Sequence, residues 1–381
     1  MENNKTPKIR FKGFTDPWEQ RKVYEIADRF DNLRVPVAAN LRVAGETPYY
    51  GANGIQDYVD GYTHDGEYVL VAEDGASDLK NYPVNYVNGC IWVNNHAHVL
   101  QGKNNIASNR FLSYAISLAN IESVLVGGGR AKLNADVMMN LNIDLPTYKE
   151  QCRVAEYFSN LDNLITLHQR KYNKLLNVKK SMLEKMFPKN GSNIPEIRFK
   201  GFTDPWEQRK LGDIADIVGG GTPSTNNADY WDGDIDWYAP AEIGDKIFVD
   251  SSERKITKEG FENCSAKLLP AGSVLFTSRA GIGKMAILRK ESCTNQGFQS
   301  IVPHEGELDS YFIFSRSDEL KNYGETVGAG STFVEVSGKQ MSNMNLMMPK
   351  SYSEQIVIGK YFSQLDDFIT LHQRELDKLK I

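Results

Sequence analysis

Only a few short stretches of this sequence carry the residue types and spacings that catalysis or metal binding requires. The run GIGK at Gly281–Lys284 is similar to the end of a phosphate-binding loop. However, Ser278 and Arg279 stand where such a loop needs its first glycine, and Met285 replaces the serine or threonine that would hold magnesium. We therefore interpret this run as a glycine turn between two strands.

Two further stretches contain residue types that bind metals. The HAH run at His96–His98 could present two imidazoles from one face of a strand, but no nearby pair of Asp or His residues completes a site. The acidic run DGDID at Asp232–Asp236 lacks the glycine and the terminal glutamate at the spacing that an EF-hand loop requires, so a solvated turn is predicted there. The motifs G-x-S-x-G and H-E-x-x-H and the Asn/Asp-Pro-Pro-aromatic tetrad of methyltransferases are absent from the sequence. The sequence therefore predicts no catalytic residue, no metal and no cofactor on this chain.

Length, composition and charge limit the class of protein. The chain has 381 residues, of which 41% are hydrophobic and 24% are charged, as is typical of a globular protein with two or three domains. No apolar run approaches the length of a membrane span, so we expect a cytoplasmic protein without a membrane partner. The four cysteines form no CxxC pair, which fits a reducing compartment and disfavours disulfides and a zinc site. The net charge of −5 argues against a non-specific nucleic-acid binder.

Two repeated blocks organise the chain. IRFKGFTDPWEQRK at Ile9–Lys22 returns unchanged at Ile197–Lys210. YFSNLDNLITLHQR at Tyr157–Arg170 returns as YFSQLDDFITLHQR at Tyr361–Arg374, with 11 of 14 positions identical. The segments between the blocks differ in sequence but keep a common skeleton: VLVAEDGA aligns with VLFTSRAG, VNNHAHVL with TNQGFQSI, and GGGRAKLN with GAGSTFVE. The pattern predicts a pseudo-two-fold internal repeat in which a variable domain and a constant helix each occur twice.

The second repeated block belongs to a long helix in each half. Apolar side chains recur there at alternating spacings of three and four, which places them on one stripe and is typical of a coiled coil. The expected helix–helix contacts are Phe158, Leu161, Ile165, His168, Tyr172 and Leu175 in the first copy and Phe362, Leu365, Ile369, His372, Leu376 and Leu379 in the second. A stripe this narrow needs a partner, so the two helices are predicted to pair antiparallel. His168 and His372 are interpreted as histidines tolerated in that contact, and the second helix lacks a counterpart of Val178–Phe187.

The variable segments are rich in short strand-like runs. Stretches such as EYVLVA and SVLFTS are bounded by Gly, Pro, Asn and Asp, and helical patterns are brief. The predicted fold class is α+β, with two mixed α/β domains separated by two long antiparallel coiled-coil-like helices. The predicted divisions are lead-ins at residues 1–22 and 189–210, variable domains at 23–146 and 211–349, and constant helices at 147–188 and 350–381.

The whole chain resembles the specificity subunits of type I restriction–modification systems. The likeness rests on the duplicated lead-ins PKIRFKGFTDPWEQRK and PEIRFKGFTDPWEQRK, the domain openings YYGANGIQDYV and GGGTPST, the helix starts LP-x-x-x-EQ and MP-x-x-x-x-EQ, and the twinned YFS-x-LD-x-x-ITLHQR helices. The resemblance implies two target-recognition domains, each of which reads one half of a split site in double-stranded DNA. It also implies constant helices that act as a spacer and dock partner subunits.

The resemblance further implies which partners and cofactors the chain works with. Two modification subunits that carry S-adenosylmethionine would methylate adenine, and restriction subunits that use ATP and magnesium would cleave unmodified DNA. The chain itself would be a non-catalytic recognition subunit. An alternative is a helical scaffold whose two β-rich domains bind protein or glycan partners, and an autonomous methyltransferase or nuclease is disfavoured because its motifs are absent. Salt-sensitive binding to a split DNA site would separate the first two alternatives.

Charge is spread unevenly over the predicted domains. Residues 23–150 contain 9 Lys/Arg and 15 Asp/Glu, and residues 211–348 contain 12 and 20, whereas residues 151–190 contain 8 and 3. The isolated chain is therefore expected to bind DNA weakly and to rely on partner subunits for phosphate contacts. The aromatic residues of the lead-ins, Phe11, Phe14 and Trp18 with Phe199, Phe202 and Trp206, are expected to anchor each half against the helices and not to touch DNA.

Base readout requires polar side chains on loops that face a groove. In the first domain the predicted contacts are Asn53, Gln56, Lys80, Asn94, Asn95, His96, His98, Lys103, Asn104, Arg130 and Lys132. In the second domain they are Thr222, Ser224, Thr225, Asn226, Arg279, Lys284, Asn295, Gln296, Gln299, Ser331 and Thr332.

Overall fold

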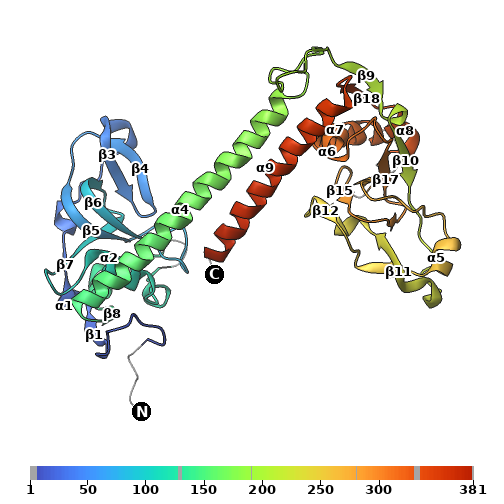
Figure 1. Cartoon of the computed structure of the whole chain (residues 1–381). Helices are drawn as coiled ribbons and strands as arrows, with labels where there is room; N and C mark the ends of the chain where they lie inside the picture. Colours follow the sequence, from blue (N-terminus) through green and yellow to red (C-terminus); the bar gives the residue numbers. More distant parts are fainter. Residues whose placement is uncertain (1–6, 128–130, 190, 280, 330–334, 380–381) are drawn as a thin grey trace. The chain divides into compact units, whose positions relative to one another are not determined.

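The computed structural model describes residues 7–127, 131–189, 191–279, 281–329 and 335–379. The chain divides into two compact units, residues 1–164 (unit 1) and residues 165–381 (unit 2). Figure 1 shows a body rich in strands in each unit and two long helices, α4 (Tyr148–Lys185) and α9 (Tyr352–Leu379). Helix α4 begins in unit 1 and ends in unit 2.

Unit 1 is built on a six-stranded sheet with the strand order β2-β7-β5-β6-β3-β4. Only β3 and β6 run parallel, and the other neighbouring pairs are antiparallel. The strands are β2 (Ala27–Arg29), β3 (Ala44–Gly51), β4 (Gly54–Val59), β5 (His64–Ala72), β6 (Val84–Val93) and β7 (Ala97–Gly102). Val69, Leu70 and Val71 in the middle of β5 are all buried, because side chains cover both faces of this strand.

Helix α2 (Asn109–Ser117) packs its apolar residues into the larger core of unit 1. The Ser108 side chain caps the helix by accepting a hydrogen bond from the Phe111 amide. Phe111, Leu112 and Ile116 are then buried in the same cluster as Val69. The remaining short helices of unit 1 are α1 (Val23–Ile26), α3 (Ala135–Met139), η1 (Asp31–Leu33), η2 (Ala39–Leu41) and η3 (Glu122–Val124).

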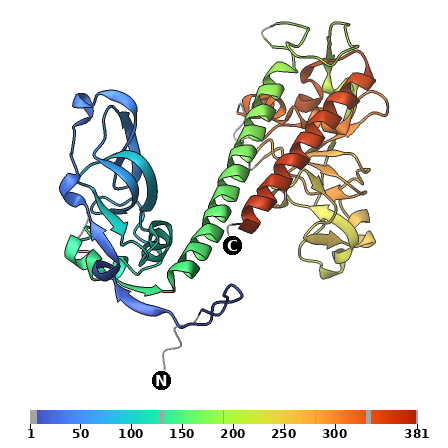
Figure 2. The same ribbon diagram turned by 60° about the vertical axis from the view of Figure 1, so that its left-hand side comes forward.

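Unit 2 contains a five-stranded sheet with the order β10-β17-β14-β15-β12 and a three-stranded sheet with the order β13-β11-β16. The strands are β10 (Ala215–Gly219), β11 (Trp231–Tyr238), β12 (Phe248–Val249), β13 (Arg254–Ile256), β14 (Val274–Phe276), β15 (Met285–Leu288), β16 (Cys293–Thr294) and β17 (Gln299–Pro303). The helices besides α9 are α5 (Lys258–Glu262), α6 (Ser310–Phe314), α7 (Ser317–Gly328), α8 (Gly338–Ser342), η4 (Leu211–Asp213), η5 (Ala228–Tyr230) and η6 (Pro240–Glu242). The second view of the chain in Figure 2 shows α9 beside the part of α4 that belongs to unit 2.

The same pattern of backbone hydrogen bonds between elements occurs within unit 1 and again within unit 2. The Glu73 amide donates to the His96 carbonyl at 2.8 Å in unit 1, and the Ser278 amide donates to the Gly297 carbonyl at 2.8 Å in unit 2. Three further bonds of unit 1 have a counterpart in unit 2. In each pair below, the amide of the first residue donates to the carbonyl of the second. The bond Asn94–Tyr50 corresponds to Asn295–Tyr238, Lys103–Ile26 to His304–Ile214, and Leu133–Glu73 to Val336–Ser278. The predicted internal repeat is therefore confirmed, including the first two aligned segments.

The third aligned segment was placed wrongly by two residues. The sequence alignment puts Leu133 opposite Val334, whereas the matching hydrogen bonds put Leu133 opposite Val336. From His304 to Val336 the chain has two residues more than from Lys103 to Leu133, and a comparison without gaps cannot detect this difference.

The invariant lead-ins close each domain by pairing with its last strand. Strand β1 (Glu19–Lys22) pairs antiparallel with β8 (Asn142–Leu145), and β9 (Glu207–Lys210) pairs in the same way with β18 (Asn345–Met348). Both lead-in strands have the sequence EQRK. An identical strand therefore joins the beginning of each variable domain to the strand that leads into its long helix.

The Glu-Gln dipeptide at the start of each long helix ties the lead-in to the helix. Arg10 forms two hydrogen bonds of 2.6 Å with the Glu150 carboxylate in unit 1. Arg198 forms the corresponding bonds with Glu354 in unit 2, at 2.7 Å and 2.8 Å. The following glutamines also make matching contacts, since Gln151 accepts from the Ser108 amide at 2.9 Å and Gln355 accepts from the Asp309 amide at 3.1 Å. These buried contacts explain why the dipeptide recurs in both halves.

Phe11 and Phe199 of the lead-ins contact the long helices, as predicted. The ring of Phe11 lies 5.7 Å from that of Tyr157 on α4, and the ring of Phe199 lies 5.8 Å from that of Tyr361 on α9. Trp206 is buried and packs against Phe187, with a centroid distance of 6.0 Å. Hydrophobic anchoring therefore accounts for these three side chains.

Helix α9 and the unit 2 part of α4 run antiparallel. Residues with rising numbers on α4 contact residues with falling numbers on α9. The contacts are His168–Glu375 at 3.3 Å and Lys179–Asp366 at 2.6 Å. Just after the end of α4, the ring centroid of Phe187 lies 6.0 Å from that of Phe362. Helix α4 ends at Lys185, shortly before Pro188, which cannot continue the helix.

The structure tests two of the local predictions made from the sequence. The glycine turn at Gly281–Lys284 is confirmed, since it connects the antiparallel strands β14 and β15. The solvated turn at Asp232–Asp236 is wrong, because this run lies in β11 and Asp236 is buried. Lys290 forms an ion pair of 2.6 Å with Asp236, and the Ser252 amide donates to the Asp236 carboxylate at 2.9 Å. These contacts compensate the cost of burying the Asp236 charge. The four cysteines are free, and no helix among the described residues has an apolar stretch long enough to cross a bilayer.

Candidate nucleic-acid interface

Most of the polar residues predicted for base contacts in unit 1 gather on one group of loops. This group, which we call loop cluster 1, comprises residues 51–56, 73–80, 94–96 and 131–133. It contains Asn53, Gln56, Lys80, Asn94, Asn95, His96 and Lys132. The loops come from strands that are distant in sequence, and hydrogen bonds between them hold the cluster together.

Amide side chains connect the first three loops of the cluster. Asn53 Nδ2 donates to the Gly75 carbonyl at 2.9 Å, and Asn53 Oδ1 accepts from the Ser77 amide at 2.7 Å. Gln56 Oε1 accepts from Asn94 Nδ2 at 3.4 Å. Asn53 and Gln56 are exposed, so each retains hydrogen-bonding capacity toward solvent or a ligand.

Glu73 holds the charged side chains of the cluster together. Arg34 Nη1 and Lys132 Nζ donate to its two carboxylate oxygens at 2.7 Å and 2.9 Å. Burial raises the pKa of Glu73, but the bonds from Arg34 and Lys132 outweigh it and leave that pKa below its usual value. The same contact raises the pKa of Lys132. The Lys132 ammonium is therefore paired within the protein, which reduces its charge toward phosphates.

The two histidines of the HAH run occupy different environments. His96 is half-buried, precedes β7 and pairs with Asp74. His98 is buried, with Nδ1 at 2.7 Å from Asp31 and Nε2 at 2.9 Å from the Leu133 carbonyl. The two rings therefore do not form a joint metal site, and His98 connects interior elements.

Burial also separates Asn94 from the exposed members of the predicted set. Its side chain is buried, and its Oδ1 accepts from the His96 amide at 2.8 Å. Lys103 and Asn104 follow β7, whereas His96 precedes it, so the length of that strand separates the two groups. Lys103 Nζ donates to the Tyr24 carbonyl at 2.9 Å. Loop cluster 1 therefore contains six exposed or half-buried candidates, namely Asn53, Gln56, Lys80, Asn95, His96 and Lys132, together with the buried Asn94. His98, Lys103 and Asn104 lie outside it.

Unit 2 builds a corresponding group of loops, which we call loop cluster 2. It comprises residues 220–227, 277–279, 281–284, 294–297 and 335–336. The Gly221 amide donates to the Thr294 carbonyl at 2.9 Å, and the Thr222 hydroxyl bonds to the Gln296 side chain. A Cβ on Gly220 would lie 2.0 Å from the Asn295 carbonyl oxygen, so only glycine permits this approach of the two loops.

The predicted contacts of unit 2 are distributed as follows. Ser224, Thr225, Asn226, Lys284 and Gln296 are exposed, whereas Thr222, Arg279, Asn295 and Gln299 are half-buried. Asn295 Oδ1 accepts from the Gly297 amide at 2.7 Å, which fixes the turn. Gln299 lies on β17 and its side chain approaches Gly338. Arg130, Ser331 and Thr332 lie outside the described residues.

The predicted contacts of the helix pair are buried to different degrees. On α9, Phe362, Leu365, His372 and Leu376 are buried, and Ile369 and Leu379 are half-buried. On α4, Leu161, Ile165, His168, Tyr172 and Leu175 are half-buried. Phe158 is 44% exposed, and its ring packs against Tyr114 of α2. The prediction did not include Glu375, which lies beside His168 and His372.

Two pseudo-repeated domains of mixed α/β structure, each followed by a long helix, define the class of this protein. Residues 15–177 and residues 203–380 each match the family described as the type I restriction modification DNA specificity domain. The chain belongs to this family, and the predicted family resemblance is confirmed. The predicted fold class, with two recognition domains and a long central helix, is confirmed as well.

Individual relatives carry corresponding names. The chain is 42% identical over 146 residues to a putative type I restriction enzyme specificity subunit of Haemophilus influenzae, covering 38% of each protein. It is 34% identical over 178 residues to the type I restriction enzyme MjaIX specificity subunit of Methanocaldococcus jannaschii, covering 46% of this chain and 41% of the relative. The alignments therefore span about two fifths of the length of these curated relatives.

One solved structure matches nearly the whole chain. The S subunit of a type I restriction–modification system from M. genitalium superposes with a TM-score of 0.67 and 14% sequence identity. The match covers 98% of this chain and 96% of that subunit. The shared fold therefore extends over both units and both long helices.

Proposed function

We propose that this chain is the non-catalytic DNA sequence-specificity subunit of a type I restriction–modification complex. It reads an asymmetric, bipartite site in double-stranded DNA, with one half-site for each loop cluster. The observation that carries the proposal is that the same loop arrangement is built twice, on corresponding backbone hydrogen bonds, with different side chains. His96 in loop cluster 1, for example, corresponds to Gly297 in loop cluster 2. One scaffold with two sets of side chains suits two different half-sites.

The exposed polar side chains of the two clusters supply the base contacts. Amide, hydroxyl, imidazole and ammonium groups are the groups that distinguish base edges in the major groove. The proposed contacts are Asn53, Gln56, Lys80, Asn95 and His96 in unit 1 and Ser224, Thr225, Asn226, Lys284 and Gln296 in unit 2. The buried residues Asn94 and His98 support this surface and do not contact DNA.

The repeated sequence blocks define the working parts of the subunit. Residues 23–146 and 211–349 act as recognition domains, residues 147–188 and 350–381 as constant helices, and residues 1–22 and 189–210 as lead-ins. Because both recognition domains carry excess negative charge, partner subunits make many of the phosphate contacts. On this proposal S-adenosylmethionine, ATP and magnesium are bound by those partners, and the complex acts on DNA in the cytoplasm.

The constant helices also carry matching docking surfaces for two copies of one partner. Leu164 and Leu167 on α4 are exposed, and so are Phe368 and Leu371 at the corresponding positions of α9. An exposed apolar pair that recurs on both helices fits an interface with a protein. Two modification subunits, one on each pair, account for this recurrence, and the restriction subunits join the resulting complex.

The proposal is tested by exchanging one recognition domain. Residues 23–145 are replaced by the corresponding segment of another family member, and the chain is combined with its cognate modification subunits. Binding to a library of duplexes at several salt concentrations should show a change in one half of the target only. The matched control exchanges residues 211–348, which should change the other half. A change in both halves, or salt-insensitive binding without sequence preference, would contradict the proposal.

A further inference from the structure

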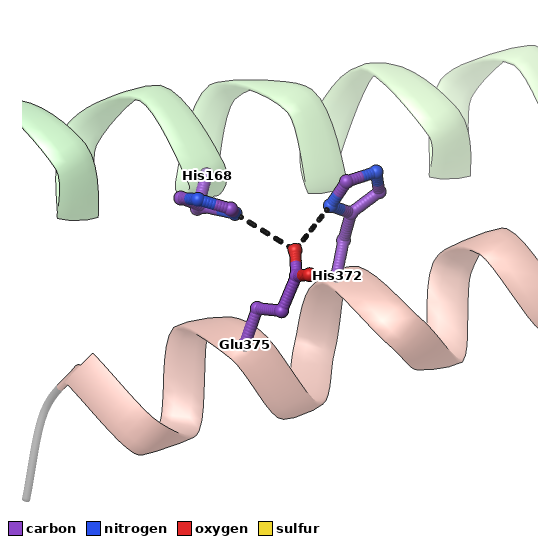
Figure 3. A group of neighbouring side chains, drawn as sticks. All are labelled: His168, His372 and Glu375. Carbon is purple, nitrogen blue, oxygen red and sulfur yellow. Dashed lines mark hydrogen bonds and ion pairs between the residues drawn. The ribbon is translucent and has the colours of Figure 1, made fainter.

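Three side chains with metal-binding donor atoms meet where α4 and α9 pack together in unit 2. They are His168 from α4 and His372 and Glu375 from α9, and Figure 3 shows both rings beside one carboxylate. The Nδ1 atoms of His168 and His372 lie 3.3 Å and 3.2 Å from the same carboxylate oxygen, Oε2 of Glu375. One donor atom of each residue lies within 4.8 Å of the other two. Among the described residues this is the one such group of three.

The repeated sequence and the antiparallel pairing bring these donors together. His168 and His372 occupy the same position in the two copies of ITLHQR, so they face each other close to the pseudo-two-fold axis of the helix pair. Glu375 follows His372 by three residues and therefore lies on the same face of α9. The first copy has Lys171 at the corresponding position, so the cluster contains one carboxylate and not two. Metal sites between facing helices commonly use such a histidine–glutamate pair with ligands from the other helix.

The spacing of the donor atoms fits a tetrahedral ion. Bonds of about 2.0 to 2.1 Å from zinc to nitrogen or oxygen place tetrahedral ligand atoms about 3.3 to 3.4 Å apart. The distances from Glu375 Oε2 to the Nδ1 atoms of His168 and His372 are 3.3 Å and 3.2 Å. Two edges of a coordination tetrahedron are therefore already present.

Hydrogen bonding does not satisfy the cluster by itself. His372 Nδ1 is aligned with Glu375 as a hydrogen bond of 3.2 Å. His168 Nδ1 is buried and has no hydrogen-bond partner among the described residues, although the same carboxylate is close. The side chains of His168 and His372 are 20% and 9% exposed, and that of Glu375 is 41% exposed. An ion at this point would engage both ring nitrogens and the carboxylate together, with its remaining position open to water.

We propose that His168, His372 and Glu375 bind one Zn²⁺ ion, which clamps α4 to α9 within unit 2. Two imidazoles and one glutamate form a known zinc donor set, and imidazole ligands also suit other late first-row ions. With three protein ligands and one position open to water, the ion would join the two helices of this chain. The sequence analysis interpreted both histidines as residues that the helix contact merely tolerates. That interpretation does not explain why Glu375 lies beside both of them.

The test is a zinc titration of the full chain against a chromophoric chelator at about pH 7.5, because protons compete with the metal for the ligands at lower pH. One ion per chain is expected. His168→Gln, His372→Gln and Glu375→Gln should each weaken zinc binding at least about tenfold, because changes to outer-shell partners alone reach 10- to 100-fold. The matched control is His304→Gln, since the His304 side chain is 37% exposed, pairs with Asp216 at 3.2 Å and lies outside the cluster.

Two further measurements keep the result interpretable. Circular dichroism shows whether each variant is folded, and zinc at about a hundredfold excess over its Kd should raise the Tm of the unchanged chain by about 5 to 10 °C but not that of Glu375→Gln. Cobalt substitution reports the ligands, and a spectrum without thiolate charge transfer excludes the free cysteines. The absence of zinc binding, binding that survives all three substitutions, or a thiolate–cobalt band would each overturn the proposal.

Discussion

Replacing Arg198 by methionine is expected to destabilise unit 2 strongly. Arg198 Nε and Nη2 donate to the two oxygens of Glu354 at 2.7 Å and 2.8 Å, and Trp206 Nε1 donates to one of them at 3.3 Å. The Glu354 side chain is only 1% exposed. Methionine retains an unbranched apolar stem but leaves this carboxylate buried without a cation.

The magnitude follows from the two ways in which the protein can tolerate the stranded carboxyl group. An unpaired buried charge costs about 3 to 5 kcal/mol. Alternatively, the carboxyl group can take up a proton when the chain folds. For a glutamate with an ordinary pKa in the unfolded state, this costs about 3.7 kcal/mol at pH 7 but about 1 kcal/mol at pH 5. The free energy of unfolding of unit 2 should therefore fall by about 3 to 4 kcal/mol at pH 7 and by about 1 to 2 kcal/mol at pH 5.

Urea denaturation of the full chain, followed by circular dichroism and tryptophan fluorescence at both pH values, measures this difference. The matched control is Arg209→Met, because Arg209 pairs with Glu307 at 2.8 Å while the two side chains are 33% and 46% exposed. Such an exposed pair contributes less than about 1 kcal/mol. Equal losses for the two variants, or the same loss for Arg198→Met at both pH values, would refute the reasoning.

Two other properties of the fold can be tested in the same way. A Cβ on Gly359 would lie 2.4 Å from Oδ1 of Asp309, which caps α6, so Gly359→Ala should destabilise unit 2 by about 1 to 3 kcal/mol, whereas alanine at exposed Lys360 should have no measurable effect in urea. The pKa values of Asp31 and Glu73 in the folded protein lie below their ordinary values. Both carboxylates therefore stabilise unit 1 fully when the pH is above the ordinary pKa values. This stabilisation is lost as the pH falls through the lower pKa values of the folded state. Acid titration should show unit 1 losing stability below about pH 4.5, and an unchanged profile for Asp31→Asn would count against this assignment.

Periodicity and repetition were enough to predict the architecture. The stripe through Leu365, Ile369 and His372 predicted a paired helix, because a three–four spacing has one structural meaning over several turns. The identical lead-ins predicted a constant element, and the structure shows that they pair with the last strand of each domain. The two glycines of Gly281–Lys284, in a run that does not match a phosphate-binding loop, also identified the turn there.

The details of the site depend on contacts between distant residues, which spacing does not report. Asp236 looked like part of a polar turn, but Lys290 compensates its burial from a position 54 residues later in the sequence. His98 looked like a surface strand residue, but it bonds Asp31 and is buried. The position of Glu375 beside His168 requires the antiparallel register of the two helices, which the heptad pattern alone does not fix.

Single-molecule sequencing of adenine methylation tests the central claim most directly. Cells that express this chain with a cognate modification subunit are compared with cells that lack the chain. The account predicts one new split motif, methylated once on each strand, whose two halves reveal what each recognition domain reads. If the complex assembles and no new motif appears, the account of this chain as a DNA specificity subunit is contradicted.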